Sequence, residues 1–167
     1  MPLASDSTDL PHADGAPSRA LAALLDQARA LQQAALAGHA RRPLLGKNIA
    51  LLCEREDGPD ARQLRSAAAE LGAQVSHIRL GLSELRTPQE LRHAARVLGR
   101  LYDALACEGM ASELVRQVGE AAGVPVFDGI ATAGHTTDQL GSLLGGAGSA
   151  EDLQRYVLQA ALLRAIA

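Results

Sequence analysis

The chain has 167 residues and a formal net charge of -3, with one Phe, two Tyr and no Trp. Its length suits one domain with a substantial core, but the charge leaves no basic stripe to neutralise nucleic-acid phosphates, and few rings are available for base stacking. No apolar run approaches the roughly 18 residues that a membrane span requires, so we expect neither nucleic-acid nor membrane partners.

The first segment, residues 1–17, mixes Ser, Pro and Ala with several Asp residues. This composition is wrong for a signal peptide and too acidic for a transit peptide, so we expect a disordered tail followed by a single domain over 18–167. Cys53 and Cys107 each end an apolar run without the close spacing of metal ligands, which is typical of reduced thiols in a cytoplasmic protein.

Apolar residues along the chain follow two alternating patterns. Leu and Ala recurring every three or four residues predict helices, and short, wholly apolar runs predict strands buried on both faces of a parallel sheet. Helices are expected at 19–37, 59–71, 88–101 and 112–122, and strands at 48–53, 75–80, 104–107 and 124–127. This alternation predicts an α/β fold: a three-layer, doubly wound sheet of about four parallel strands with helices on both faces. Sites in such sheets form at the carboxyl ends of the strands.

Two further helices are expected near the end of the chain. Residues 136–144 have a helical pattern that stops at the flexible run Gly145–Gly148. Ser149, followed by acidic residues in the first turn, is a helix-start signature, and the apolar positions beyond it predict an amphipathic helix over 149–166.

Several segments resemble one enzyme family in order and spacing. They are Leu45–Leu52, Ala67–Ala73, Val124–Val126 and His135–Thr137. Together they resemble the N-terminal, carbamoyl-phosphate-binding domain of the aspartate/ornithine carbamoyltransferases. The last helix is similar to the family's C-terminal helix, which packs on that same domain. The resemblance implies a stand-alone first domain, with the run Gly145–Gly148 lying where the family has its second, amino-acid-binding domain.

The family's phosphate loop is altered in this sequence. In the family, Ser-Thr-Arg-Thr-Arg follows the first strand and holds the phosphate through backbone N–H groups and arginines. The resemblance carries these five positions onto Asp57, Gly58, Pro59, Asp60 and Ala61, so both arginines are lost and two carboxylates are gained. A carboxylate about 4 Å from a phosphate costs on the order of 4 kcal/mol at an effective dielectric constant near 20.

The helix that follows this loop keeps its start signals. Asp57 is expected to cap it, and Pro59 suits its first position. Arg62 and Arg65 lie one turn further on, within reach of an anion, but we expect them to pair with Glu56 or Asp60 at the surface.

Two other parts of the family's site are also degraded. A family arginine just after the third strand aligns with Glu108. The motif His-Pro-x-Gln, which contacts the carbamoyl group in the family, becomes His135-Thr136-Thr137-Asp138, leaving His135 and Thr137 as remnant catalytic candidates. The loop that the family lends to a neighbouring subunit aligns near residues 89–94 and has lost its pattern as well.

The leading hypothesis is a carbamoyltransferase-like protein that has lost carbamoyl transfer and serves as an oligomerising, ligand-sensing or partner-binding module, without a cofactor. Its expected partners are further copies of itself, as a trimer or dimer, or a full-length carbamoyltransferase. Asp57, Asp60, Glu108 and Asp138 then either form a redesigned pocket for a cationic or neutral ligand or belong to a solvated helix start.

Two alternatives remain at this point. In the first, the chain still binds carbamoyl phosphate or another anion, with Arg62, Arg65 or Arg100 replacing the lost arginines and a separate protein supplying the amino-acid site. In the second, Cys53, Cys107 and His135 meet at one rim of the sheet and form a zinc or thiol site. Against the second, both cysteines continue apolar strands and suit the role of small buried hydrophobic residues.

Overall fold

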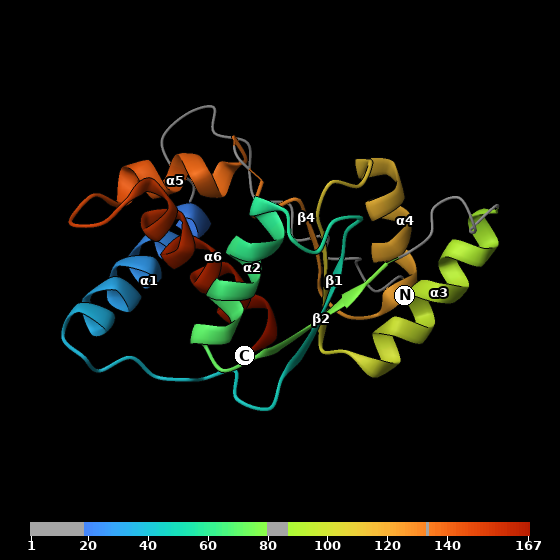
Figure 1. Ribbon diagram of the computed structural model, residues 1–167, viewed down its shortest axis with the longest axis horizontal. Helices are drawn as coiled ribbons and strands as arrows, with labels where there is room; N and C mark the ends of the chain where they lie inside the picture. Colours follow the sequence, from blue (N-terminus) through green and yellow to red (C-terminus); the bar gives the residue numbers. More distant parts are fainter. Residues whose placement is uncertain (1–18, 80–86, 133) are drawn as a thin grey trace.

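The computed structural model describes residues 19–79, 87–132 and 134–167. The expected N-terminal tail at 1–17 and the last residue of the expected second strand, Leu80, lie outside the described residues. A central sheet separates α1, α2, α5 and α6 on one side from α3 and α4 on the other (Figure 1). Within the described residues, no helix is both long and apolar enough to cross a membrane.

The sheet has four parallel strands in the order β2-β1-β3-β4, which confirms the predicted α/β fold. The elements are α1 Arg19–Leu36, β1 Asn48–Leu52, α2 Pro59–Glu70, β2 Gln74–Ile78, α3 Pro88–Leu101, β3 Ala104–Cys107, α4 Ser112–Ala122, β4 Val126–Asp128, α5 Thr136–Leu144 and α6 Ala150–Ile166. The last strand begins two residues later than expected. Pro125 has no N–H group to donate to a ladder, so regular pairing starts at Val126.

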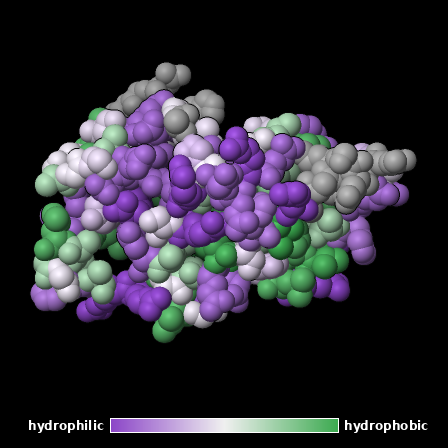
Figure 2. Space-filling model, viewed as in Figure 1, coloured by the Kyte–Doolittle hydropathy of each residue, from purple (hydrophilic) through white to green (hydrophobic). Residues whose placement is uncertain are grey.

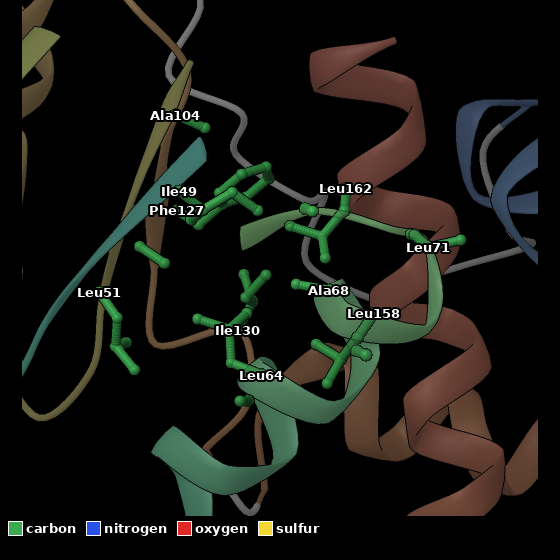
Figure 3. Close-up of a cluster of buried hydrophobic side chains, with 14 of the residues drawn as sticks. Ile49, Leu51, Leu64, Ala68, Leu71, Ala104, Phe127, Ile130, Leu158 and Leu162 are labelled. Atoms are coloured by element: carbon green, nitrogen blue, oxygen red, sulfur yellow. The ribbon is translucent and has the colours of Figure 1, made fainter. Parts of the chain in front are cut away.

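The two central strands send alternate side chains to opposite faces of the sheet. Ile49 and Leu51 of β1, with Ala104 of β3 and Phe127 of β4, pack against α2 and α6 (Figure 3). The intervening residues, such as Ala50, pack against α3 and α4. Both faces are therefore covered, which is why β1 and β3 are continuous apolar runs and do not alternate with polar residues.

Helix α6 differs from the expected amphipathic helix. Every residue from Val157 to Leu163 is buried. The reason is that α2 packs on one side of α6, while α1 and α5 form a separate apolar cluster with its other side. A helix enclosed by other elements has no need for a polar face.

Candidate functional site

A pocket of about 250 Å³ lies where β1 and β3 end and α2 begins. Its lining consists of Cys53, Glu54, Arg55, Gly58, Pro59, Asp60, Ala61, Glu108 and Gly109. This is the carboxyl edge of the parallel sheet, where the fold predicts a site. The structure thus brings Gly58, Pro59, Asp60, Ala61 and Glu108, all expected from the sequence, into one pocket.

The start of α2 differs from the prediction in one respect. Gly58 is the N-cap residue and has no side-chain capping bond, so the expected capping role of Asp57 is wrong. Asp57 stands one residue too early in the chain to cap the helix, and its exposed carboxylate lies 3.6 Å from Nε of Arg55. Pro59 does occupy the first turn, as expected. The helix start is therefore stabilised by Pro59 and left without a side-chain cap.

Glu108 is the most deeply buried charged side chain of the pocket, with 4% of its surface exposed. Its Oε1 accepts a hydrogen bond from the backbone N–H of Ala131 (3.2 Å). Its Oε2 lies 3.1 Å from the hydroxyl of Thr132, and the same hydroxyl lies 3.2 Å from Oδ2 of Asp60. Burial raises the pKa of Glu108 to about 7, since the two hydrogen bonds offset it only in part and Asp60 and Asp128 add to it.

The arginines that an anion site would need lie elsewhere. Arg62 is exposed on α2, and Nη2 of Arg65 lies 3.4 Å from Oε1 of Glu56, the surface pairing expected for it. Arg100 lies in the last turn of α3, just before β3 begins, and therefore at the opposite edge of the sheet. None of these three arginines is among the residues that line the pocket.

Residues 135–138 lie outside the pocket lining, and their side chains form hydrogen bonds with nearby backbone groups. Nδ1 of His135 accepts a hydrogen bond from the backbone N–H of Thr137 (3.2 Å), so His135 caps α5. Burial lowers the pKa of this imidazole. The buried hydroxyl of Thr137 donates to the carbonyl of Ile130, and Oδ2 of Asp138 accepts from the N–H of Gly134 (2.9 Å). These hydrogen bonds stabilise the turn that precedes α5 and the first turn of that helix.

The two cysteines do not meet at the rim. Although β1 and β3 are neighbours, Cys53 packs on the α2 side of the sheet and Cys107 on the α3 side. Burial, with smaller contributions from Asp128 and Glu108, raises the pKa of the Cys107 thiol to about 12, so it stays protonated. Among the residues that the structure describes, no cluster of three or more His, Cys, Asp and Glu side chains is arranged to hold a metal ion.

Sequence reasoning missed several residues around the pocket, among them Glu54 and Gly109 of its lining. Thr132 joins two carboxylates, and Arg55 lines the pocket. His77, which shows no partner in the sequence pattern, places Nε2 2.8 Å from the carbonyl oxygen of Cys53 and Nδ1 3.6 Å from Oε2 of Glu56. The one available signal was position: residues at or just beyond the ends of parallel strands gather at the same edge.

Comparison with known proteins places this chain beside the ornithine carbamoyltransferases. It is 38% identical over 127 residues to the catabolic ornithine carbamoyltransferase of Burkholderia mallei, which covers 76% of this chain and 38% of that protein. The ornithine carbamoyltransferase of Haemophilus influenzae is 37% identical over 121 residues, covering 72% of this chain and 36% of that protein. The chain therefore spans less than two fifths of the length of these curated relatives. No protein-family model matches it.

Solved structures show the same fold. The ornithine carbamoyltransferase from Pyrococcus furiosus superposes with a TM-score of 0.63 at 24% identity, over 73% of this chain and 39% of that chain. The catalytic subunit of M. jannaschii aspartate transcarbamoylase gives a TM-score of 0.60 at 19% identity, over 72% of this chain and 40% of that chain. At these identities the superpositions speak for the fold alone.

Proposed function

We propose that this chain, a relative of the ornithine carbamoyltransferases over about three quarters of its length, has lost carbamoyl transfer and serves as an oligomerising, ligand-sensing or partner-binding protein. The observation that carries the proposal is the charge of the pocket. Three carboxyl groups line it, those of Glu54, Asp60 and Glu108, and the pKa of Glu108 is about 7. The lining contains one guanidinium, that of Arg55, which faces the carboxylate of Asp57 at 3.6 Å.

A phosphate group in this pocket would face carboxyl groups and would lack the arginines that the resemblance implies. Pro59 and Ala61, the positions onto which the resemblance carries the family's arginines, both line the pocket and offer no charge. Each ionised carboxylate about 4 Å from a phosphate opposes binding by on the order of 4 kcal/mol at an effective dielectric constant near 20. Lost attraction and added repulsion together disfavour carbamoyl phosphate. The same charges suit a neutral or cationic ligand.

Calorimetric titration with carbamoyl phosphate, with inorganic phosphate in parallel, tests the loss of the substrate. We expect no saturable heat with either anion at millimolar concentrations, and no carbamoylated product when ornithine or aspartate is supplied. An active ornithine carbamoyltransferase under the same conditions is the positive control. Saturable binding at micromolar concentrations would contradict the proposal and would favour an anion site rebuilt by other arginines.

A double variant separates the two causes of the loss. Asp60→Asn with Glu108→Gln removes two pocket carboxylates and keeps both side-chain shapes. If repulsion dominates, the double variant gains weak phosphate binding that the unchanged protein lacks. If the missing arginines dominate, neither the double variant nor the unchanged protein gives saturable heat with phosphate. The matched control is Glu113→Gln, an exposed carboxylate on α4 away from the pocket lining.

Association is supported by the surface of α3. Val97 and Leu101 are 43% and 66% exposed and lie four residues apart, so they share one face of the helix. Apolar areas are scattered among hydrophilic ones on the face of the molecule in Figure 2. The resemblance also aligns the family's subunit-contacting loop with the start of α3. A second copy of this chain, or a full-length carbamoyltransferase, is the partner that we propose for this face.

A further inference from the structure

Three segments that are distant in sequence meet at one hydroxyl beside the pocket. Thr132 follows β4, Asp60 lies in the first turn of α2, and Glu108 directly follows β3. The hydroxyl oxygen of Thr132 lies 3.1 Å from Oε2 of Glu108 and 3.2 Å from Oδ2 of Asp60. The neighbouring backbone N–H of Ala131 donates to the other Glu108 oxygen at 3.2 Å. Glu108 and Thr132 thus link residues 131–132 to the end of β3 and to α2, next to the backbone hydrogen bond from the N–H of Gly129 to the carbonyl of Cys107 (2.7 Å).

The number of protons decides whether this arrangement is stable. A threonine hydroxyl carries one hydrogen and accepts at its lone pairs, whereas an ionised carboxylate can only accept. If Glu108 and Asp60 are both ionised, the hydroxyl of Thr132 can donate to only one of them. The lone pairs of its oxygen then face the lone pairs of the other carboxylate oxygen, which is a repulsive contact. If Glu108 is protonated, it donates to Thr132, which donates to Asp60, and both contacts are hydrogen bonds.

We propose that Glu108, Thr132 and Asp60 form a proton-controlled latch, which holds residues 129–132 against β3 and α2 while Glu108 is protonated and releases them when it ionises. This latch is independent of the proposed loss of carbamoyl transfer. It concerns how the wall of the pocket and the start of α5 respond to pH. Because Glu108 lines the pocket, its ionised carboxylate has a route toward water once it leaves Ala131 and Thr132.

The groups that face Glu108 favour the protonated state. Asp60 approaches from α2 and Asp128 from β4, and both are carboxylates that raise the pKa of Glu108 further after burial has raised it. Cys53 directly follows β1 and remains a thiol. Burial, with a smaller contribution from the charge of Glu108, raises the pKa of Cys53. Arg55 is the basic residue of the pocket lining, and its Nε lies 3.6 Å from Oδ1 of Asp57. The pKa of Glu108, about 7, places the transition within the range of ordinary cellular pH.

Hydrogen exchange of the full chain, read by mass spectrometry, tests the latch directly. Protection is compared at about pH 5.5 and about pH 8, after correction for the intrinsic exchange rate at each pH. We expect peptides covering residues 129–138 to lose protection by roughly tenfold or more at the higher pH, since ionisation favours the open form. Peptides from α3 and α4, on the other side of the sheet, serve as the internal reference.

A Glu108→Gln variant supplies the matched control. Its amide can accept from the Ala131 N–H and donate to Thr132, as protonated Glu108 does, but cannot ionise. We expect its 129–138 peptides to keep the same protection at both pH values. If the 129–138 peptides of the unchanged protein are equally protected at both pH values, that result alone overturns the latch. An equal pH response in Glu108→Gln would overturn it as well, because the response would then come from another group.

Discussion

Glu108 is both a pocket residue and a buried hydrogen-bond acceptor. A carboxyl group stands at the end of β3, where the resemblance implies an arginine, and burial raises its pKa to about 7. Its two oxygens are used by Ala131 and Thr132, so the side chain now links parts of the fold. The same residue lines the pocket and links Ala131 and Thr132 to the end of β3.

The raised pKa of Glu108 predicts how stability depends on pH. The folded state binds this proton more tightly than the unfolded chain, whose glutamate has the model value of 4.5. The contribution to the free energy of unfolding is therefore complete below about pH 4.5 and is lost as pH rises through about 7. The full loss is about 3 kcal/mol, the free energy that corresponds to this pKa difference.

Denaturant unfolding of the unchanged protein and Glu108→Gln at about pH 5 and about pH 8 measures this loss. We expect the unchanged protein to lose stability relative to the variant on going to the higher pH. Glu151→Gln, an exposed carboxylate in the first turn of α6 and outside the pocket lining, should keep the pH dependence of the unchanged protein. Parallel pH profiles for the unchanged protein and Glu108→Gln would show that Glu108 is not protonated in the folded state.

At the scale of elements, the contact between α3 and α4 depends on a glycine. A Cβ atom added at Gly99 of α3 would lie 1.8 Å from the carbonyl oxygen of Ala122 at the end of α4. Backbone is the obstacle, so no side-chain rotation can relieve the overlap. The two helices that cover this face of the sheet can approach each other only because residue 99 has no side chain.

Gly99→Ala should therefore destabilise the protein by about 1–3 kcal/mol or more, the range for overpacked cores. The matched control is Gly119→Ala in α4, where the added Cβ would lie 4.0 Å from Cβ of Val126, an ordinary contact. It should be neutral or raise stability by roughly 0.5–1 kcal/mol, since alanine favours a helix. Thermal or denaturant unfolding checks both. Equal effects of the two variants would mean that α3 can shift to accommodate a methyl group.

The packing of elements also explains why α6 is buried on all sides from Val157 to Leu163. Sequence periodicity predicts one buried face, because a single helix packing on one neighbour needs no more. In the structure α2, α1 and α5 surround it, and Val157 and Leu158 are completely buried on different sides. The positions of three other helices decide this burial, and those positions are not encoded in the local pattern of α6.

For the molecule as a whole, the proposed association through α3 makes a prediction about mass. Size-exclusion chromatography with light scattering should give a multiple of the 17.4 kDa chain. Val97→Lys with Leu101→Lys should shift the protein toward the monomer, because lysine side chains in an apolar contact carry a charge that must be desolvated. The control is Leu143→Lys on α5, which is 65% exposed and lies on another element. A monomer in the unchanged protein would contradict the proposal.

The sequence by itself determined the layered α/β fold, the edge of the sheet where the pocket lies and two of the carboxyl groups that line it. Apolar runs, helical periodicity and the rule that parallel strands end at one edge are local or topological features, so Asp60 and Glu108 could be assigned to the same rim. Only the tertiary structure decided that Cys53 and Cys107 face opposite sides of the sheet and that Thr132 joins Asp60 to Glu108. These outcomes depend on side-chain direction and burial between segments distant in sequence, and burial is what sets the pKa of Glu108.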